Sequence, residues 1–266
     1  MTGLFTGEVA LSDHACTGQF ESNFPMKLAI GLLAGASALC LASSAFAAPP
    51  APIAPGEGAA WGAYFKSDHR AVVVAAMKEF LKSAPSSKTL AGGICVSRDN
   101  NTEYLVYTSY ANFADLFTAH GNLPSADIQA LAHLQYRAQF KPLILALMPV
   151  GNTDSKTVHQ FFRFSVPLKN TEAFVQAASK VNVTLATEIK GASVAVFQPA
   201  AGGGTNEVNV LHVRIVYPDD KSLGMGMDSY FKGGKLGAAF NEMWSLSTGI
   251  ASGSIEDCEQ FDYAKK

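Results

Sequence analysis

The sequence contains few charged residues and no excess of either sign. Asp, Glu, Lys and Arg make up 16% of the 266 residues, and the formal net charge at pH 7 is −2. Nucleic acids and anionic membrane surfaces are both bound by clusters of Lys and Arg side chains. The sequence has no such cluster, which argues against a nucleic-acid partner and against electrostatic attachment to a membrane.

The sequence also lacks the short motifs of the common catalytic and metal sites. It has no G-x-S-x-G nucleophile elbow, no H-E-x-x-H, no C-x-x-C and no EF-hand loop. Residues 229–236 resemble a phosphate-binding loop only superficially. Ser229 replaces its first glycine, and Leu236 replaces the Ser or Thr that binds magnesium. We therefore expect no metal site and no organic cofactor.

Residues 26–47 have the pattern of a signal peptide. Lys27 gives a positive start, and residues 28–41 form an apolar run too short to span a bilayer comfortably. Ala45-Phe46-Ala47 then supplies the small-x-small pattern of a cleavage site. We predict an exported protein, periplasmic or secreted, that is cleaved after Ala47 and has no membrane contact afterwards.

The segments on either side of this signal fit the same interpretation. Residues 1–25 are polar and mixed, unlike the start of a signal peptide, which favours Met26 over Met1 as the true start. Residues 48–58 are rich in Ala and Pro and indicate an extended linker. We expect ordered structure from about Trp61 onward.

Cysteine is scarce once the signal is removed. Cys16 and Cys40 leave with the leader, whereas Cys95 and Cys258 remain. In an oxidising compartment the default expectation for such a pair is one disulfide. Two buried free thiols are the alternative.

Strand and helix patterns follow one another in the same order twice. In the first half, 59–150, strands are predicted at 61–66, 90–98, 103–110 and 143–148, and helices at 70–83, 112–120 and 125–139. After a polar linker at 151–156, the second half, 151–266, has predicted strands at 158–166, 192–198, 208–217 and 250–260, and helices at 171–185 and 227–247. Residues 201–205, with three glycines, are predicted to form a loose turn.

Two consecutive β-α-β-β-α-β units describe the ferredoxin-like arrangement. On this order of elements, residues 61–261 resemble a tandem member of the dimeric α+β barrel superfamily. The resemblance implies an α+β fold in which two ferredoxin-like sheets pack face to face as an intramolecular barrel. It also implies that Cys95 and Cys258 lie on edge strands that meet at the seam, so that a disulfide would tie the halves together. A single irregular α+β domain with accidental duplication is the alternative.

Strand alternation gives the candidate site. His159 and Arg163 share one face of the strand at 158–166, and His212 and Arg214 share one face of the strand at 208–217. The opposite faces are apolar and suited to packing on helices. In the ferredoxin-like arrangement these two strands are neighbours and the last strand, with Glu256, flanks the first. We therefore expect these five side chains in the interior between the sheets.

This cluster predicts a site for a small anionic or carbonyl compound. Arg163 and Arg214 would hold the anionic group, and His212 or His159 would move protons near neutral pH. Tyr64 and Tyr107, at the corresponding positions of the first half, would form the opposite wall. The alternatives are a structural polar network with Arg163 paired to Glu256, or an outward, solvated face.

The resemblance implies a small-molecule site, because the superfamily includes cofactor-free oxygenases, lactone isomerases and haem-handling enzymes. The sequence selects neither His159 nor His212 as a haem ligand. Our hypothesis is an exported small-molecule-binding protein or a cofactor-free enzyme. A non-catalytic envelope or structural protein is the alternative, and the oligomeric state is left open.

Overall fold

The computed structural model describes residues 58–82, 86–100, 103–119, 125–144 and 155–263. The predicted extension, the signal peptide and residues 48–57 of the linker lie outside these ranges. The same holds for residues 145–148 of the strand predicted at 143–148 and for residues 151–154 of the linker between the halves.

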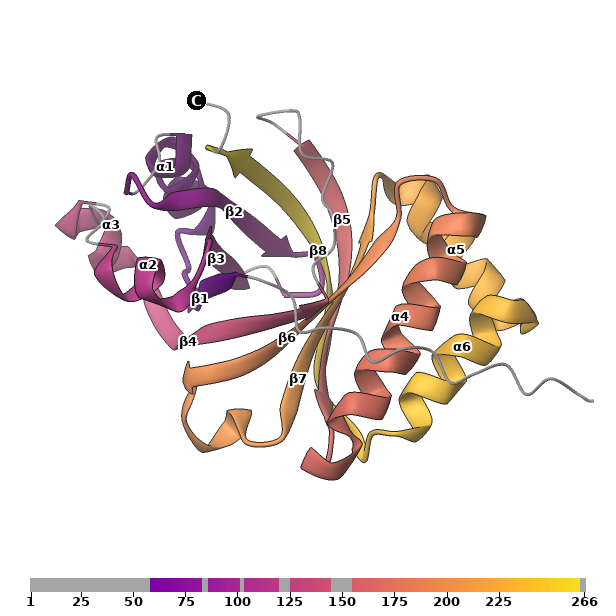
Figure 1. Ribbon diagram of the computed structural model, residues 1–266. Helices are drawn as coiled ribbons and strands as arrows, with labels where there is room; N and C mark the ends of the chain where they lie inside the picture. Colours follow the sequence, from indigo (N-terminus) through magenta and orange to yellow (C-terminus); the bar gives the residue numbers. More distant parts are fainter. Residues whose placement is uncertain (1–57, 83–85, 101–102, 120–124, 145–154, 264–266) are drawn as a thin grey trace, which may run out of the picture. The chain divides into compact units, whose positions relative to one another are not determined.

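Eight antiparallel strands form a closed barrel (Figure 1). Their bounds are β1 Ala59–Lys66, β2 Thr89–Ser97, β3 Glu103–Tyr110, β4 His133–Ile144, β5 Ser155–Ser165, β6 Ser193–Gly202, β7 Val210–Tyr217 and β8 Gly249–Asp262. The order around the barrel is β1-β3-β2-β8-β5-β7-β6-β4. The two predicted sheets are thus one continuous sheet, which β2–β8 and β4–β6 pairing closes.

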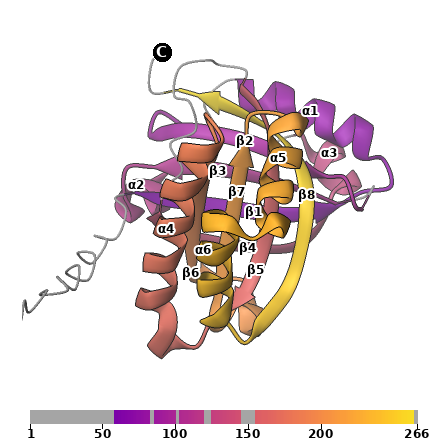
Figure 2. The same ribbon diagram turned by 90° about the vertical axis from the view of Figure 1, so that its right-hand side faces the viewer.

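Six helices among the described residues cover the outside of this barrel. Their bounds are α1 Arg70–Lys82, α2 Phe113–Thr118, α3 Ala126–Leu131, α4 Thr171–Glu188, α5 Asp220–Lys232 and α6 Gly234–Ser245, and two short 3₁₀ turns are η1 Leu168–Asn170 and η2 Gly204–Glu207. The helices α4 and α6 pack side by side over the second half (Figure 2). In the described ranges, no helix has both the length and the apolar character needed to cross a membrane.

The larger hydrophobic core lies between the barrel and the pair α4–α6. Phe164, Phe174, Leu185, Leu236 and Met243 are all fully buried there. Each such side chain contributes roughly 1.5–3 kcal/mol on leaving water. A second cluster lies under α1 and is built on Val73, Leu81, Ile94 and Tyr104.

Strand β7 shows why the site faces inward. All eight of its residues are buried, because one face packs on the helices and the other faces the barrel interior. Leu211, Val213 and Ile215 belong to the helix-side core, so His212 and Arg214 point the other way. The predicted inward orientation of the polar face is confirmed for this strand.

One predicted helix is wrong in its second half. Residues 133–139 belong to β4, whereas the helix α3 ends at Leu131. Tyr136, Ala138 and Phe140 alternate with more exposed residues, and the strand pairs with β1 on one side and β6 on the other. Tertiary pairing therefore overrides the helical pattern of this segment.

Three smaller boundaries also differ from the prediction. The strand β6 continues to Gly202 by pairing with β4, so the predicted loose turn begins later, at Gly203 (φ 75°) and Gly204 (φ 66°). Ser155 and Lys156 belong to β5 and not to the linker. The helix predicted at 227–247 begins earlier, at Asp220, and is two helices, α5 and α6. They meet at Gly233 (φ 89°), a backbone conformation suited to glycine.

Candidate functional site

A cavity of about 490 Å³ occupies the interior of the barrel. All eight strands contribute to its lining, and most of the lining side chains are apolar or aromatic. It extends from the exposed Leu90 and Ala111 to the buried His159 and His212. Its size suits a small organic molecule.

His159 lies on β5 with only 3% of its surface exposed. Its Nε2 is 2.9 Å from Thr157 Oγ1, and its Nδ1 is 3.5 Å from Arg214 Nη1. A guanidinium can only donate, so Nδ1 is the acceptor and Nε2 carries the proton. Burial, followed by the positive charge of Arg214, lowers the pKa of His159 well below its usual value. The imidazole is therefore neutral at neutral pH.

Arg214 on β7 joins three strands. Its Nη1 donates to Glu256 Oε2 of β8 at 2.6 Å, and its Nη2 donates to Tyr64 Oη of β1 at 3.0 Å. The guanidinium also lies 4.4 Å from the centre of the Phe161 ring. Burial disfavours the charge, but Glu256 and Tyr64 outweigh it and raise the pKa of Arg214 above its ordinary value. Arg214 is therefore a permanent buried cation with a paired carboxylate.

Glu207 on η2 forms a second buried network. Its Oε1 accepts from Arg163 Nη2 at 2.5 Å, and its Oε2 is 2.7 Å from His212 Nε2. Because a carboxylate accepts, Nε2 of His212 carries the proton. Burial lowers the pKa of His212, although the hydrogen bond to Glu207 opposes this. The rings of Phe140 and Phe161 lie 4.8 and 5.4 Å from the imidazole.

The structure thus divides the predicted site residues into two groups. His159, Arg214, Glu256 and Tyr64 come together in one network beside the cavity. The cavity lining also includes Tyr107, whose hydroxyl donates to Gln260 Oε1 at 3.0 Å.

Arg163 and His212 belong to the other group, with Glu207. The alternative interpretation in which Arg163 pairs with Glu256 is wrong, because Glu256 pairs with Arg214.

Sequence reasoning missed Glu207 and the residues that β4 contributes. Glu207 follows the glycines 202–204 as an isolated carboxylate before an apolar strand. That isolation is the one sequence feature that could have marked it as a candidate site residue. Phe140 and Pro142 line the cavity from β4. The sequence assigned Phe140 to no element, and its strand was predicted to begin only at residue 143.

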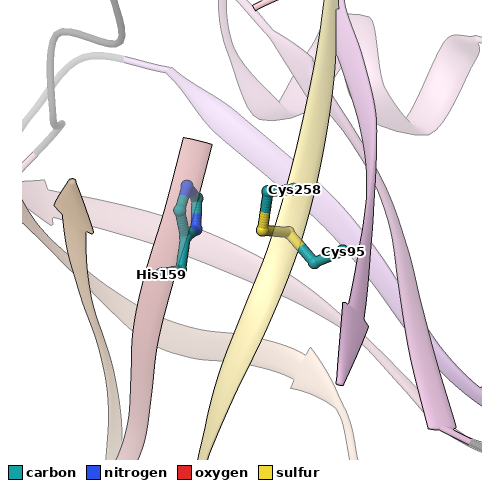
Figure 3. Close-up of side chains that lie close together, drawn as sticks. All are labelled: Cys95, His159 and Cys258. Carbon is teal, nitrogen blue, oxygen red and sulfur yellow. A yellow bond between two sulfur atoms is a disulfide. The ribbon is translucent and has the colours of Figure 1, made fainter. Parts of the chain in front are cut away.

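The disulfide predicted between Cys95 and Cys258 is confirmed. The two residues are directly opposite each other in the antiparallel pair β2–β8, and their sulfurs are bonded at 2.03 Å. Figure 3 shows the bond beside the imidazole of His159. Both cysteines are buried, and Leu105, Tyr64 and Tyr107 pack around them.

No protein-family model matches the sequence, and no curated protein matches it either. Solved structures do match. An anthrone oxidase-like protein has a TM-score of 0.57 and 12% identity, over 79% of this chain and 95% of that chain. A candidate monooxygenase from Fusobacterium nucleatum has a TM-score of 0.56 and 13% identity, over 77% and 94%.

A second candidate monooxygenase, from Lactobacillus acidophilus, has a TM-score of 0.52 and 12% identity, over 77% of this chain and 94% of that chain. At such identities the similarity shows the fold alone. That fold is an α+β fold with a closed antiparallel barrel, and the order of elements in the sequence predicted an α+β barrel.

Proposed function

We propose that this protein binds a neutral aromatic compound with a carbonyl or hydroxyl group and acts on it as a cofactor-free enzyme. The observation that carries the proposal is the cavity of about 490 Å³, whose largely apolar lining also includes two buried histidines and one buried arginine. An apolar pocket with a few placed polar groups is the usual form of a small-molecule site.

The pairing of charges favours a neutral ligand over an anionic one. Arg214 is paired with Glu256, and Arg163 with Glu207, so that each buried cation has its own carboxylate. An anion would have to compete with these carboxylates in a site of low polarity. The carbonyl part of our sequence-based hypothesis is therefore the part that we retain.

The polar groups of the cavity have distinct roles in this proposal. Arg214 and Tyr64 donate hydrogen bonds to the ligand's oxygen, and Tyr107 covers its ring. His212 is the proton acceptor, because burial keeps its imidazole neutral, whereas the acceptor nitrogen of His159 faces the Arg214 guanidinium. Glu207 holds His212 with Nε2 protonated, which leaves Nδ1 as the acceptor.

The similar structures support an oxidising enzyme. Two are described as monooxygenases and one as anthrone oxidase-like. Anthrone is a tricyclic aromatic ketone, a class of compound that suits a cavity with aromatic walls. We extend this chemistry to the present chain as a proposal only.

We further infer two properties of the whole chain. The halves 59–150 and 151–266 are two ferredoxin-like repeats, supported by the β-α-β-β order that each half follows. The protein is exported with cleavage after Ala47, supported by the buried disulfide, since disulfides form and persist in oxidising compartments.

The direct test is native mass spectrometry of residues 48–266 purified from a periplasm. We expect additional mass that is lost on denaturation, and its value would identify the ligand. Ala195→Phe places a ring into the cavity and should abolish this mass. Ala251→Phe, at an exposed position of β8, is the matched control and should retain it. Equal retention by both variants would contradict the proposed site.

The self-contained charge networks favour a second candidate, a binding protein without catalysis. Both carboxylate oxygens of Glu207 have a protein partner, Arg163 and His212. Those of Glu256 accept from Arg214 and Ser254, as in a structural network. Once the ligand is identified, His212→Ala and His159→Ala distinguish the candidates. If the protein is an enzyme, the variants lose turnover but still bind the ligand and fold. If it is a binding protein, neither the wild type nor the variants show turnover.

A further inference from the structure

The disulfide forms part of the cavity wall in an unusual electrostatic setting. Cys95 lines the cavity, and a ring nitrogen of His159 and both sulfurs all lie within 4.8 Å of one another (Figure 3). The guanidinium of Arg214 donates from Nη1 toward Cys95 Sγ at 3.7 Å. One sulfur of the bond is thus in contact with a permanent cation and near a neutral base.

This setting argues against a metal site. If the disulfide were reduced, two thiolates and one imidazole would be a suitable ligand set for a soft metal ion. However, Arg214 Nη1 lies 3.7 Å from Cys95 Sγ and 3.5 Å from His159 Nδ1, so a metal ion would be close to a positive charge. The same charge stabilises a thiolate at Cys95.

Access to the disulfide is restricted to small molecules. Cys95 is 1% exposed and Cys258 is 3% exposed, so a thiol carried by another protein cannot approach either sulfur. A compound inside the cavity, by contrast, contacts Cys95, which belongs to the lining. The sulfur of Cys95 is therefore the one that a bound compound can react with, and Cys258 is the resolving cysteine.

We propose that the Cys95–Cys258 pair is a redox centre that exchanges two electrons with a quinone-type compound bound in the cavity. The inference rests on the proposed small-molecule site. A quinone is a flat ring with two carbonyl groups, and it accepts two electrons and two protons. The aromatic lining fits the ring, and Arg214 and Tyr64 supply the hydrogen bonds for one carbonyl.

The exchange is balanced without a further reactant. In the reduced protein, the Cys95 sulfur adds to the quinone ring, and its thiol proton passes to a quinone oxygen. Cys258 then attacks the Cys95 sulfur, the S–S bond forms, and the carbon–sulfur bond breaks with its electron pair left on the ring. Both thiol protons end on the two oxygens, so that a dithiol and a quinone become a disulfide and a hydroquinone.

The test uses reduced protein and a quinone that forms no stable thiol adduct. Residues 48–266 are reduced with a phosphine, desalted without oxygen and mixed with tetramethyl-1,4-benzoquinone, whose ring carbons are all substituted. We expect one quinone consumed per protein, a mass decrease of two hydrogens and a rate that saturates with quinone concentration. The same reduced protein unfolded in urea should react without saturation and about tenfold more slowly, because it has no bound complex.

A charge-neutral double variant tests the role of Arg214. Arg214→Gln with Glu256→Gln removes the cation without leaving its carboxylate unpaired, and we expect the rate to fall about tenfold. Lys180→Gln with Glu242→Gln removes an exposed ion pair in the same way and should leave the rate unchanged. A folded wild-type protein that reacts no faster than the unfolded protein overturns the proposal, whatever the double variant does.

Calorimetry of the oxidised protein separates this inference from the proposed function. If the oxidised protein binds the quinone but the reduced protein transfers no electrons, the redox centre is wrong and the small-molecule site stands. If calorimetry shows no quinone binding while native mass spectrometry shows another ligand, the quinone class is wrong. If neither method shows a ligand, the proposed function and this inference both fail.

Discussion

At the scale of single residues, two Arg–Glu pairs place mutually compensated charges in the barrel interior. Arg163 and Glu207 are 15% and 3% exposed at their side chains, and Arg214 and Glu256 are 10% and 6% exposed. Removing a charge from water costs several kcal/mol, and a close partner offsets that cost. Loss of one partner should therefore be far more harmful than loss of an exposed charge.

Glu207→Ala is predicted to lower the free energy of unfolding by about 3 kcal/mol, because it leaves the largely buried Arg163 guanidinium without its carboxylate. Glu242→Ala is the control, since its pair with Lys180 is half exposed, and such pairs contribute roughly 0–1 kcal/mol. Urea titrations monitored by circular dichroism measure the free energy of unfolding of both variants. Similar losses for the two variants would show that the buried network is not stabilising.

The buried histidine of β5 predicts how stability depends on pH. The pKa of His159 is held well below its usual value in the folded state, so only the unfolded chain binds a proton there in mildly acidic solution. Its contribution is fully present above about pH 6.5 and is lost as the pH falls below that value, by up to about 1.4 kcal/mol per pH unit. Unfolding at pH 7.5, 6 and 5 measures this slope. His159→Asn should reduce this slope and leave the part that buried His212 contributes, whereas His133→Asn, at an exposed position, should leave the slope unchanged.

At the scale of elements, the sequence predicted best where one strand carries two distinct faces. In β5 and β7 the alternation of polar and apolar residues predicted which side chains face the interior. It failed for β4, where Tyr136, Ala138 and Phe140 are spaced as in a strand but follow a short amphipathic helix. Only the pairing of β4 with β1 and β6 decides between a strand and a continued helix, and that pairing depends on residues far apart in the sequence.

The same argument explains why Glu207 escaped prediction. It lies on a 3₁₀ turn, which has no period that would assign it to a face. Its role depends on Arg163 and His212, which belong to two other elements. Residues on strands are therefore predictable from the local pattern, whereas the partners of this carboxylate are known only from the folded chain.

Two glycines of α5 should respond oppositely to the same substitution. A Cβ at Gly224 would meet no atom within 4 Å, so Gly224→Ala should stabilise the protein by about 0.5–1 kcal/mol through helix propensity. A Cβ at Gly226 would lie 2.7 Å from the Tyr217 ring, so Gly226→Ala should destabilise it by about 1–3 kcal/mol. Thermal unfolding of both variants compares them. Stabilisation by Gly226→Ala would contradict the packing of α5 on β7.

At the scale of the whole barrel, the decisive feature is closure between the two halves. The pair β2–β8 joins the first half to the second, and β4–β6 joins them again on the other side (Figure 1). Closure satisfies the edges that two separate four-stranded sheets would leave exposed. The resemblance to barrel-forming relatives implied that edges meet at a seam, but the register that places Cys95 opposite Cys258 comes only from the structure.

The disulfide at this seam should contribute strongly to the stability of the barrel. Its cysteines are 163 residues apart, and closing a loop of that length restricts the unfolded chain by about 5 kcal/mol in the chain-entropy model. Reduction of the wild type should lower the free energy of unfolding by that amount in urea titrations. The double variant Cys95→Ala, Cys258→Ala should have the same free energy of unfolding as the reduced wild type, and the reductant should not change it. A reduced wild type as stable as the oxidised protein would show that hydrogen bonding and packing alone hold β2 against β8.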